Sequence, residues 1–191
     1  MIYRLGRAAE YRDNETGNHV KRVSLIAELI AQDLGQDQEF CRLIKIASPM
    51  HDIGKIGVSD TILLKPGKLS EEEFVLMKDH VKIGAEILSE SDSPILKMAY
   101  EIALTHHEKF NGRGYPHGLK GEEIPLSGRI VALADVFDAL TSERPYKKAW
   151  SIKAALELIR NESGEHFDPQ VVDAFLRVFS EVETVSKQFV D

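Results

Sequence analysis

The chain has 191 residues, of which 43% are hydrophobic and 29% are charged, a balance that fits one globular domain or one domain with an appendage. A net charge of −7 argues against a nucleic-acid polymer as partner, while a local cationic pocket would still suit a small phosphorylated ligand. The single cysteine, Cys41, excludes an intrachain disulfide and is expected to be a packed core side chain rather than a catalytic thiol. No stretch is apolar for long enough to span a bilayer and the N-terminus does not read as a signal peptide, so we expect a cytoplasmic location.

Helical periodicity dominates the chain. The first clear helix is expected over residues 19–34, where apolar side chains recur every three or four positions and Gly35 then ends the pattern. Further helices are expected at 38–50, 69–80, 93–108, 125–142, 151–160 and 167–180. Ser70 and Glu73 form a capping box, and Asp168 with Pro169 marks another helix start. Only residues 56–64 contain short β-like runs, which a turn at Pro66–Gly67 ends.

These patterns predict an all-α fold, a compact bundle of about seven or eight helices. Two irregular segments interrupt it, at residues 53–69 and 109–123. The second segment, KFNGRGYPHGLKGEE, is rich in glycine and needs a function or a tether to remain ordered.

Histidines and acids cluster at the ends of these helices. Glu15 and His19 are four residues apart, so on a helix they share a face and can reach one ion. By themselves, the two residues are more simply explained as a solvated N-terminal pair. His51 and Asp52 are adjacent, and they can serve one site if the carboxylate bridges two metals while the imidazole holds one of them. The alternative is a helix-terminal histidine beside a turn aspartate.

Other candidates follow further along the chain. His80 by itself is typical of a surface histidine. His106 and His107 end an apolar helix, and two neighbouring imidazoles are costly to bury unless each finds a partner, which a shared metal centre would provide. Asp135 lies on an apolar helix face and needs a partner or a cation. Asp138 follows it by one turn, either as a hydrogen-bond partner to a ligating histidine or as an ordinary helix-surface acid.

Together these residues supply five imidazoles and three carboxylates from several helices. Such a donor set is typical of a multinuclear site for iron, manganese or similar ions, whereas zinc more often uses four ligands that include cysteine. The candidate metal ligands are Glu15, His19, His51, Asp52, His80, His106, His107 and Asp135.

Three segments resemble the signatures of the HD-GYP family, a branch of the HD-domain metal-dependent phosphohydrolases. They are HDIGK at 51–55, HHEKFNGRGYP at 106–116 and DVFDALTSERPYK at 135–147, joined by the spaced Glu15 and His19 and by His80. The resemblance covers nearly the whole chain. Asn111 stands where many members have aspartate, which alters loop hydrogen bonding without an expected loss of catalysis.

The resemblance implies an HD-type helical fold around two or three divalent ions, with iron or manganese expected. It also implies hydrolysis of cyclic di-GMP to linear pGpG and, in some members, onward to GMP. We expect a metal-bridging hydroxide to attack phosphorus in line, with His51, Asp52 and Lys55 as the catalytic residues. Glu15 is the ligand associated with trinuclear rather than binuclear members.

The resemblance also marks a set of substrate contacts, and each has a physical reason. Lys55 offers a mobile charge to a phosphate, and the basic run around Arg144 either grips phosphate or is a solvated helix terminus. Glycine lets backbone N–H groups approach a ligand, and a tyrosine offers its ring to guanine or its hydroxyl to phosphate. The full set is Lys55, Gly112, Gly114, Tyr115, Arg144 and Lys147.

Two alternatives to this enzyme remain open. One is a catalytically silent cyclic di-GMP sensor, against which the full ligand set argues. The other is an HD phosphohydrolase acting on a different nucleotide, which the GYP segment disfavours.

The resemblance also suggests how the chain is organised. Residues 1–14 are expected to form a connector helix and residues 15–191 the phosphohydrolase domain. Family members often carry a fused receiver or sensor domain ahead of this unit, and the leading helix is a candidate dimer contact. His117 and His166 match no ligand position and are expected to be loop and surface histidines.

Overall fold

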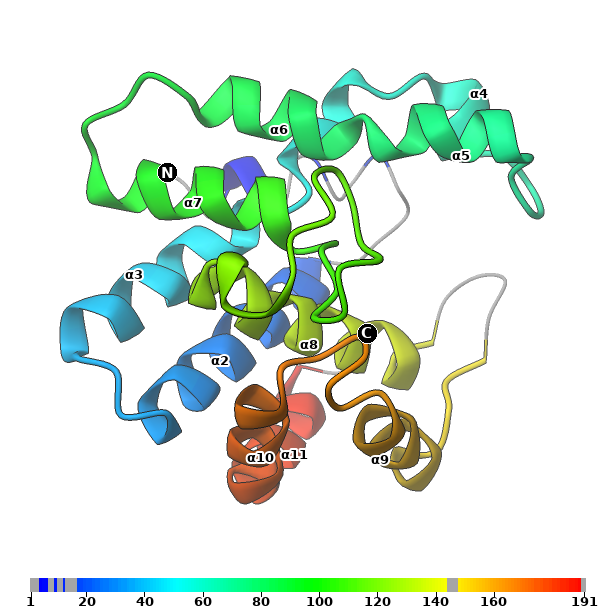
Figure 1. Cartoon of the computed structure of the whole chain (residues 1–191). Coiled ribbons are helices and arrows are strands. Elements are labelled where there is room, and N and C mark those ends of the chain that lie inside the picture. The colour runs from blue at the N-terminus through cyan, green and yellow to red at the C-terminus, as the bar shows by residue number, and fades with distance from the viewer. Residues whose placement is uncertain (1–3, 7–8, 10–11, 13–16, 144–147, 190–191) are drawn as a thin grey trace.

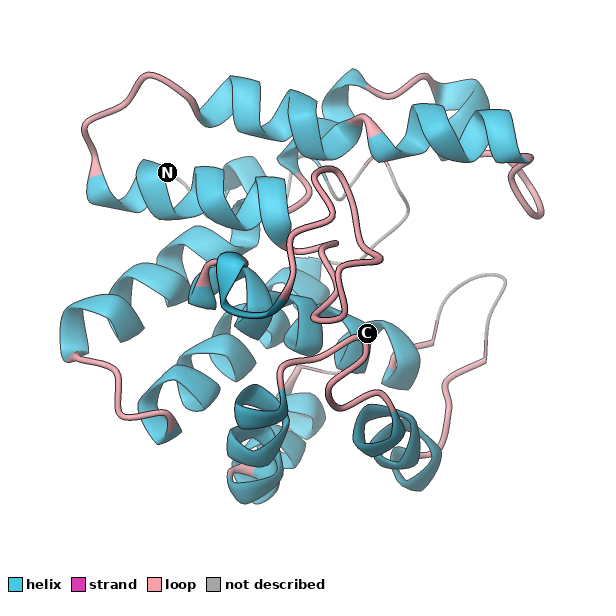
Figure 2. Ribbon diagram, in the orientation of Figure 1, coloured by secondary structure: helices cyan, strands magenta, loops and turns pink. Residues whose placement is uncertain are grey.

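The computed structural model describes residues 4–6, 9, 12, 17–143 and 148–189. In this part of the chain the regular structure is helical, and the only β pairing is in isolated bridges, which confirms the all-α prediction (Figure 2). No helix among these residues is long and apolar enough to cross a membrane. The α-helices are α2 (Gly17–Asp33), α3 (Gln38–Ala47), α4 (Asp60–Leu63), α5 (Glu71–Lys78), α6 (His80–Leu88), α7 (Pro94–Thr105), α8 (Leu126–Thr141), α9 (Ile152–Asn161), α10 (Pro169–Arg177) and α11 (Phe179–Gln188). Three 3-10 turns are η1 (Ser48–Met50), η2 (Ile53–Gly57) and η3 (Gly121–Glu123).

Helix α2 lies near the centre of the bundle. It packs against α3, α8, α10 and α11, while α7 contacts α3, α6 and α8. In Figure 1, α5 and α6 run along one edge of the molecule and α9, α10 and α11 lie at the opposite edge. The apolar stripe of α2, including Val23, Ile26 and Ile30, is fully buried in the core. Burial of this stripe is the main reason that the segment forms a stable helix.

The seven helices expected from periodicity are all present, but the described chain contains three more. Asp79 both ends α5 and precedes α6, with helical φ and ψ of −63° and −17°, so the two helices follow without a linker. A similar break at Val178 separates α10 from α11. The β-like reading of residues 56–64 was wrong, because this segment forms part of η2 and the short helix α4. A short apolar run does not distinguish a strand from a helical turn.

The predicted caps are confirmed. The Ser70 hydroxyl accepts a hydrogen bond from the Glu73 backbone N–H, and the Glu73 carboxylate accepts one from the Ser70 N–H at 2.7 Å. Asp168 accepts from the Gln170 N–H at 2.8 Å, and Pro169 occupies the first position of α10. These bonds satisfy helix-terminal donors that would otherwise lack partners.

Cys41 is buried, as expected, and burial raises the pKa of its thiol. His117 is exposed on its loop, also as expected. His166 is not a surface histidine, because its ring is half-buried and stacks on Phe167 with centroids 4.3 Å apart. Burial, followed by the nearby Lys109 charge, lowers the pKa of His166 to about 4, so the ring is neutral at pH 7.

The N-terminal residues that the structure describes pack against the bundle. Ala9 is buried in the core. The Arg12 guanidinium donates hydrogen bonds to the backbone oxygens of Lys55 at 3.2 Å and Val58 at 3.1 Å. Arg12 therefore ties the start of the chain to the segment that follows His51 and Asp52. The division into a connector at 1–14 and a domain at 15–191 stays a prediction.

Candidate metal centre

The predicted ligands approach one another from helices far apart in the sequence. His19 lies on α2 and Asp135 on α8, while His51 and Asp52 lie between the 3-10 turns η1 and η2. His80 begins α6, and His106 and His107 directly follow α7. Within the described residues, seven of the eight predicted ligands fall into two adjoining groups, which are Asp52, His80, His106 and His107 in the first and His19, His51 and Asp135 in the second.

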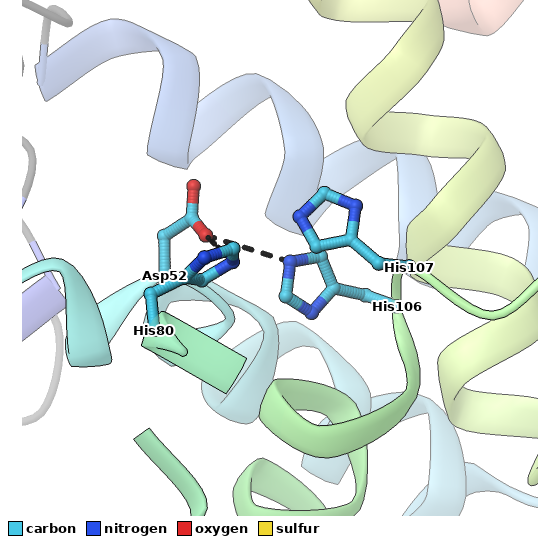
Figure 3. Close-up of side chains that lie close together, drawn as sticks. All are labelled: Asp52, His80, His106 and His107. Carbon is cyan, nitrogen blue, oxygen red and sulfur yellow. Dashed lines mark ion pairs between the residues drawn. The ribbon is translucent and has the colours of Figure 1, made fainter. Parts of the chain in front are cut away.

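In the first group, one donor atom from each side chain lies within 4.8 Å of the others. His80 Nε2 is 3.2 Å and His106 Nε2 is 3.4 Å from Asp52 Oδ1. Figure 3 shows the Asp52 carboxylate facing these two rings, with His107 beside His106. Three imidazoles and one carboxylate at this spacing are enough to hold a divalent ion.

The second group adjoins the first through Asp52. Asp135 Oδ1 lies 3.4 Å from His19 Nε2 and 3.8 Å from His51 Nε2. His51 Nε2 is also 3.5 Å from Asp52 Oδ2, the carboxylate oxygen that faces away from His80. Each Asp52 oxygen therefore faces a different group. This is the arrangement required of a carboxylate that bridges two ions.

The outer ring nitrogens of the histidines are held in place. His51 Nδ1 lies 2.9 Å from the Ser48 carbonyl, His80 Nδ1 lies 2.7 Å from that of Met77, and His106 Nδ1 lies 3.0 Å from that of Ile102. A carbonyl oxygen only accepts, so each Nδ1 carries the proton and donates. Each Nε2 then turns its lone pair toward the centre, as is usual for a ligating histidine.

His19 uses a carboxylate in place of a carbonyl. Its Nδ1 lies 2.7 Å from Asp138 Oδ2. Asp138 is therefore the hydrogen-bond partner of His19 and not an ordinary helix-surface acid. Asp138 is also gripped by Arg22, through Nε at 2.6 Å and Nη2 at 3.0 Å. Asp138 is 1% exposed and Arg22 is 3% exposed, so this ion pair is buried. Burial alone would raise the pKa of Asp138, but the His19 and Arg22 hydrogen bonds lower it.

The inner donor atoms fit a metal better than they fit the protein alone. Asp52 Oδ1 and the Nε2 atoms of His51, His80 and His106 are shielded from solvent and make no hydrogen bond within the described part of the chain. Buried polar atoms without a partner are rare and costly. Here they converge within two adjoining groups, and a cation coordinated in each group would satisfy them.

The protonation states of His51, His107 and Asp52 suit the same purpose. Burial lowers the pKa of His51, and burial followed by the neighbouring His106 lowers that of His107 well below its usual range. Burial would raise the pKa of Asp52, but the Lys55 ammonium and then His51 hold it well below normal. At pH 7 His51 and His107 are therefore neutral and Asp52 is ionised. These are the forms that bind metal.

Two predicted substrate contacts border the centre. The Lys55 ammonium lies 2.7 Å from Asp52 Oδ2 and the residue is only 8% exposed. The Tyr115 ring stacks on His107, with centroids 4.8 Å apart and an interplanar angle of 23°. Glu15, Arg144 and Lys147 lie outside the described residues.

The loop at 109–123 is held by a buried glutamate that was not predicted from the sequence. Glu108 is 2% exposed. Its carboxylate accepts backbone hydrogen bonds from His117 at 2.8 Å, Gly118 at 3.1 Å and Leu119 at 3.1 Å. The only sequence signal was a glutamate directly after His106 and His107. Glu108 thus acts on the loop rather than joining the metal groups.

The loop glycines are needed for backbone conformation and packing. Gly112 has a φ of +84°, which disfavours any side chain. A Cβ at Gly114 would lie 2.3 Å from the Lys109 nitrogen and 2.4 Å from the Glu108 Cα, so two backbone segments cross there. Asn111 donates to the Glu165 carboxylate at 2.8 Å, where an aspartate would place two acids together.

Glu108→Gln is expected to loosen this loop, because one acceptor oxygen becomes an NH₂ donor that opposes a backbone N–H. The free energy of unfolding should fall by about 1–3 kcal/mol. Hydrogen exchange at the amides of 117–119 should accelerate by about tenfold or more. Glu122→Gln, at an exposed site on the same loop, is the matched control. Equal exchange in the two variants would show that Glu108 does not hold the loop.

Comparisons with known proteins show the family of the chain. Residues 5–171 match the HD domain family. Over 188 residues the chain is 51% identical to the cyclic di-GMP phosphodiesterase response regulator RpfG of Xanthomonas campestris, covering 98% of this chain and 50% of that protein. It is 46% identical over 181 residues to the 3'3'-cGAMP-specific phosphodiesterase 2 of Vibrio cholerae, covering 95% of this chain and 35% of that protein.

The chain thus spans half the length of RpfG and about a third of the second relative. Among solved structures, a cyclic GMP-AMP-specific phosphodiesterase of V. cholerae, V-cGAP3, superposes with a TM-score of 0.68 at 21% identity, covering 100% of this chain and 53% of that one. This likeness shows the shared fold. The chain therefore belongs to the HD domain family, in the HD-GYP branch to which its three signature segments pointed.

Proposed function

We propose that this chain is a metal-dependent phosphodiesterase that hydrolyses cyclic di-GMP to linear pGpG, and onward to GMP where the second bond is also cleaved. The observation that carries the proposal is the meeting of two donor groups at Asp52. Within the described residues, the buried inner atoms of Asp52, His51, His80 and His106 make no hydrogen bond. The name and similarity of RpfG support the cyclic dinucleotide as substrate.

We propose His19, His51, Asp52, His80, His106, His107 and Asp135 as the metal ligands, with Glu15 as a further one. Nitrogen and oxygen donors without a thiolate suit iron or manganese. Divalent ions in such a set act as Lewis acids on a phosphate ester and lower the pKa of water in the site.

The chain's own residues would position the substrate. Lys55 lies beside Asp52, where its ammonium can hold a phosphate oxygen as a point charge. Asp138 holds the His19 ring in a fixed tautomer through Nδ1. Arg144 and Lys147 are proposed to bind phosphate from the basic segment after α8. Asp52, by facing both groups, would set their separation.

A second substrate is favoured by a specific observation, the 46% identity to a relative named for 3'3'-cGAMP. The two cyclic dinucleotides share the phosphodiester ring and one guanine. A direct competition between them would show which is preferred.

Product analysis tests the proposed function. The purified chain, loaded anaerobically with Mn²⁺ or Fe²⁺, is incubated with cyclic di-GMP or 3'3'-cGAMP, and products are identified by chromatography and mass spectrometry. We expect pGpG to be the first product, and we expect no product to form when the metal is removed by a chelator. Binding of cyclic di-GMP with no linear product, in protein shown to contain metal, would instead favour the silent sensor.

We propose that the domain works in the cytoplasm as the output unit of a two-component response regulator, the class to which the name of RpfG assigns that relative. A receiver domain would then be linked through residues 1–14. We further propose that the leading helix mediates a homodimer, and sedimentation of the chain with and without these residues tests that contact.

A further inference from the structure

Helix α5 is unusual because none of its residues is buried. It nevertheless carries three consecutive apolar side chains at the surface, Phe74 at 45%, Val75 at 59% and Leu76 at 52% exposed. Phe74 is distinguished from the other two by its neighbour. Its ring centroid lies 6.4 Å from that of Tyr115, in an edge-to-face arrangement.

One ammonium group makes cation–π contacts with both of these rings. The Lys78 ammonium lies 4.8 Å from the Phe74 centroid and 5.1 Å from the Tyr115 centroid. Lys78 forms no ion pair within the described residues, in contrast to Lys65, which pairs with Glu73. An exposed aromatic ring with an adjacent, unpaired ammonium is a surface suited to a flat, electron-rich group.

This surface is continuous with the candidate metal centre. Tyr115 stacks on His107, and His107 shares a donor group with Asp52. Tyr115 thus lies between the other two rings, with its centroid 6.4 Å from that of Phe74 and 4.8 Å from that of His107. A nucleotide whose phosphate lies at the metals can reach this far with its base.

We propose that Phe74 and Lys78 form a nucleobase subsite, in which a guanine of the substrate stacks on Phe74 and accepts a hydrogen bond from the Lys78 ammonium. The proposal rests on the proposed function and names the residues that would read the base. Guanine presents two acceptors, O6 and N7, on the edge that lysine recognises. Adenine carries an amino donor in place of O6, and an ammonium, which only donates, is opposed by it. The subsite should therefore favour guanine.

The experiment compares two diesters on the metal-loaded chain. Cyclic di-GMP carries the bases, whereas bis(p-nitrophenyl) phosphate has no purine and its rings are too close to phosphorus to reach Phe74. For Phe74→Ala, loss of one stacked base should raise KM for cyclic di-GMP by about 5- to 100-fold. Turnover of bis(p-nitrophenyl) phosphate and the metal content should stay within about twofold of wild type.

Val75→Ala is the matched control, because Val75 is the exposed neighbour of Phe74 on the same helix. It should leave both substrates unaffected. Lys78→Gln should lower the preference for cyclic di-GMP over cyclic di-AMP by about tenfold or more, because the base loses a charged hydrogen-bond donor. An unchanged KM for cyclic di-GMP in Phe74→Ala, or equal losses on both diesters, would overturn the subsite.

Failure of the proposed function would look different. In that case the metal-loaded wild-type chain would cleave neither cyclic dinucleotide. Calorimetric titration with cyclic di-GMP would then decide the subsite without catalysis. Weaker binding to Phe74→Ala than to Val75→Ala would support it, and equal or absent binding in both variants would refute it.

Discussion

Asp52→Asn is expected to remove bound metal and turnover together. Asp52 Oδ1 faces His80 and His106, while Oδ2 faces His51 and Lys55. Asparagine keeps one oxygen and replaces the other with an NH₂ group, which has no lone pair for a metal. One donor group therefore loses its carboxylate, and the two groups lose their bridge. Metal content should fall by at least about one ion per chain, and turnover of cyclic di-GMP by about a thousandfold or more.

Elemental analysis of anaerobically prepared protein, with product assays on the same samples, measures both effects. Asp173→Asn is the control, because Asp173 is exposed on α10. A circular dichroism melt shows that each variant is folded. Full turnover by folded Asp52→Asn would refute the role of Asp52, and retained metal with lost turnover would refute the bridge while sparing a chemical role.

Arg22→Met is expected to have the largest effect on stability. It would leave the Asp138 carboxylate, 1% exposed, without its two guanidinium hydrogen bonds. Removing one partner of a buried ion pair typically costs about 3–5 kcal/mol, because the remaining charge is buried without compensation. For a chain of this size we expect Tm to fall by roughly 10 °C.

The same change should weaken metal binding selectively. Arg22 holds Asp138, and Asp138 in turn accepts from His19 Nδ1, so the His19 ring loses part of its support. His80 and His106 depend on the carbonyls of Met77 and Ile102 instead. We therefore expect weaker metal binding in the group with His19 and little change in the group with His80.

Arg42→Met provides the comparison, since Arg42 pairs with Glu39 at the surface, where the two side chains are 54% and 57% exposed. Its effect on the free energy of unfolding should stay within about 1 kcal/mol. Thermal melts of both variants, with and without added Mn²⁺, measure the difference. Equal Tm values for Arg22→Met and Arg42→Met would show that the buried pair contributes no more than a surface one.

Several features followed from residues close together in the chain. The stripe of α2, the capping box at Ser70 and the start of α10 at Asp168 all depend on contacts three or four positions apart. The adjacent pair at 106–107 likewise pointed to the candidate metal centre, because two neighbouring imidazoles are costly to bury without partners.

Helix α6 was not foreseen in this way. The predicted helix ended at residue 80 and none was expected over 81–88, whereas α6 begins at His80, directly after Asp79. The position of His80 at a helix start was therefore not foreseen. Helix α11 was missed as well, because the predicted helix ended at residue 180, whereas Val178, with φ of −94° and ψ of 16°, separates α10 from α11. Glu108 also gave little signal, since its three partners lie 9, 10 and 11 residues away on an irregular loop.

Residue types and local spacing thus predicted seven of the helices and the candidate donors, seven of which the structure brings together. Which donors share a group depends on how α6 packs against η2 and α7 and how α2 packs against α8. The ion pair of Arg22 with Asp138, 116 residues away, likewise depends on the packing of α2 against α8. The physical reason is the distance along the chain between the residues that interact. Periodicity and capping arise within one or two helical turns, whereas a metal site and a buried ion pair depend on how distant helices pack, and one chain read alone carries no direct record of that.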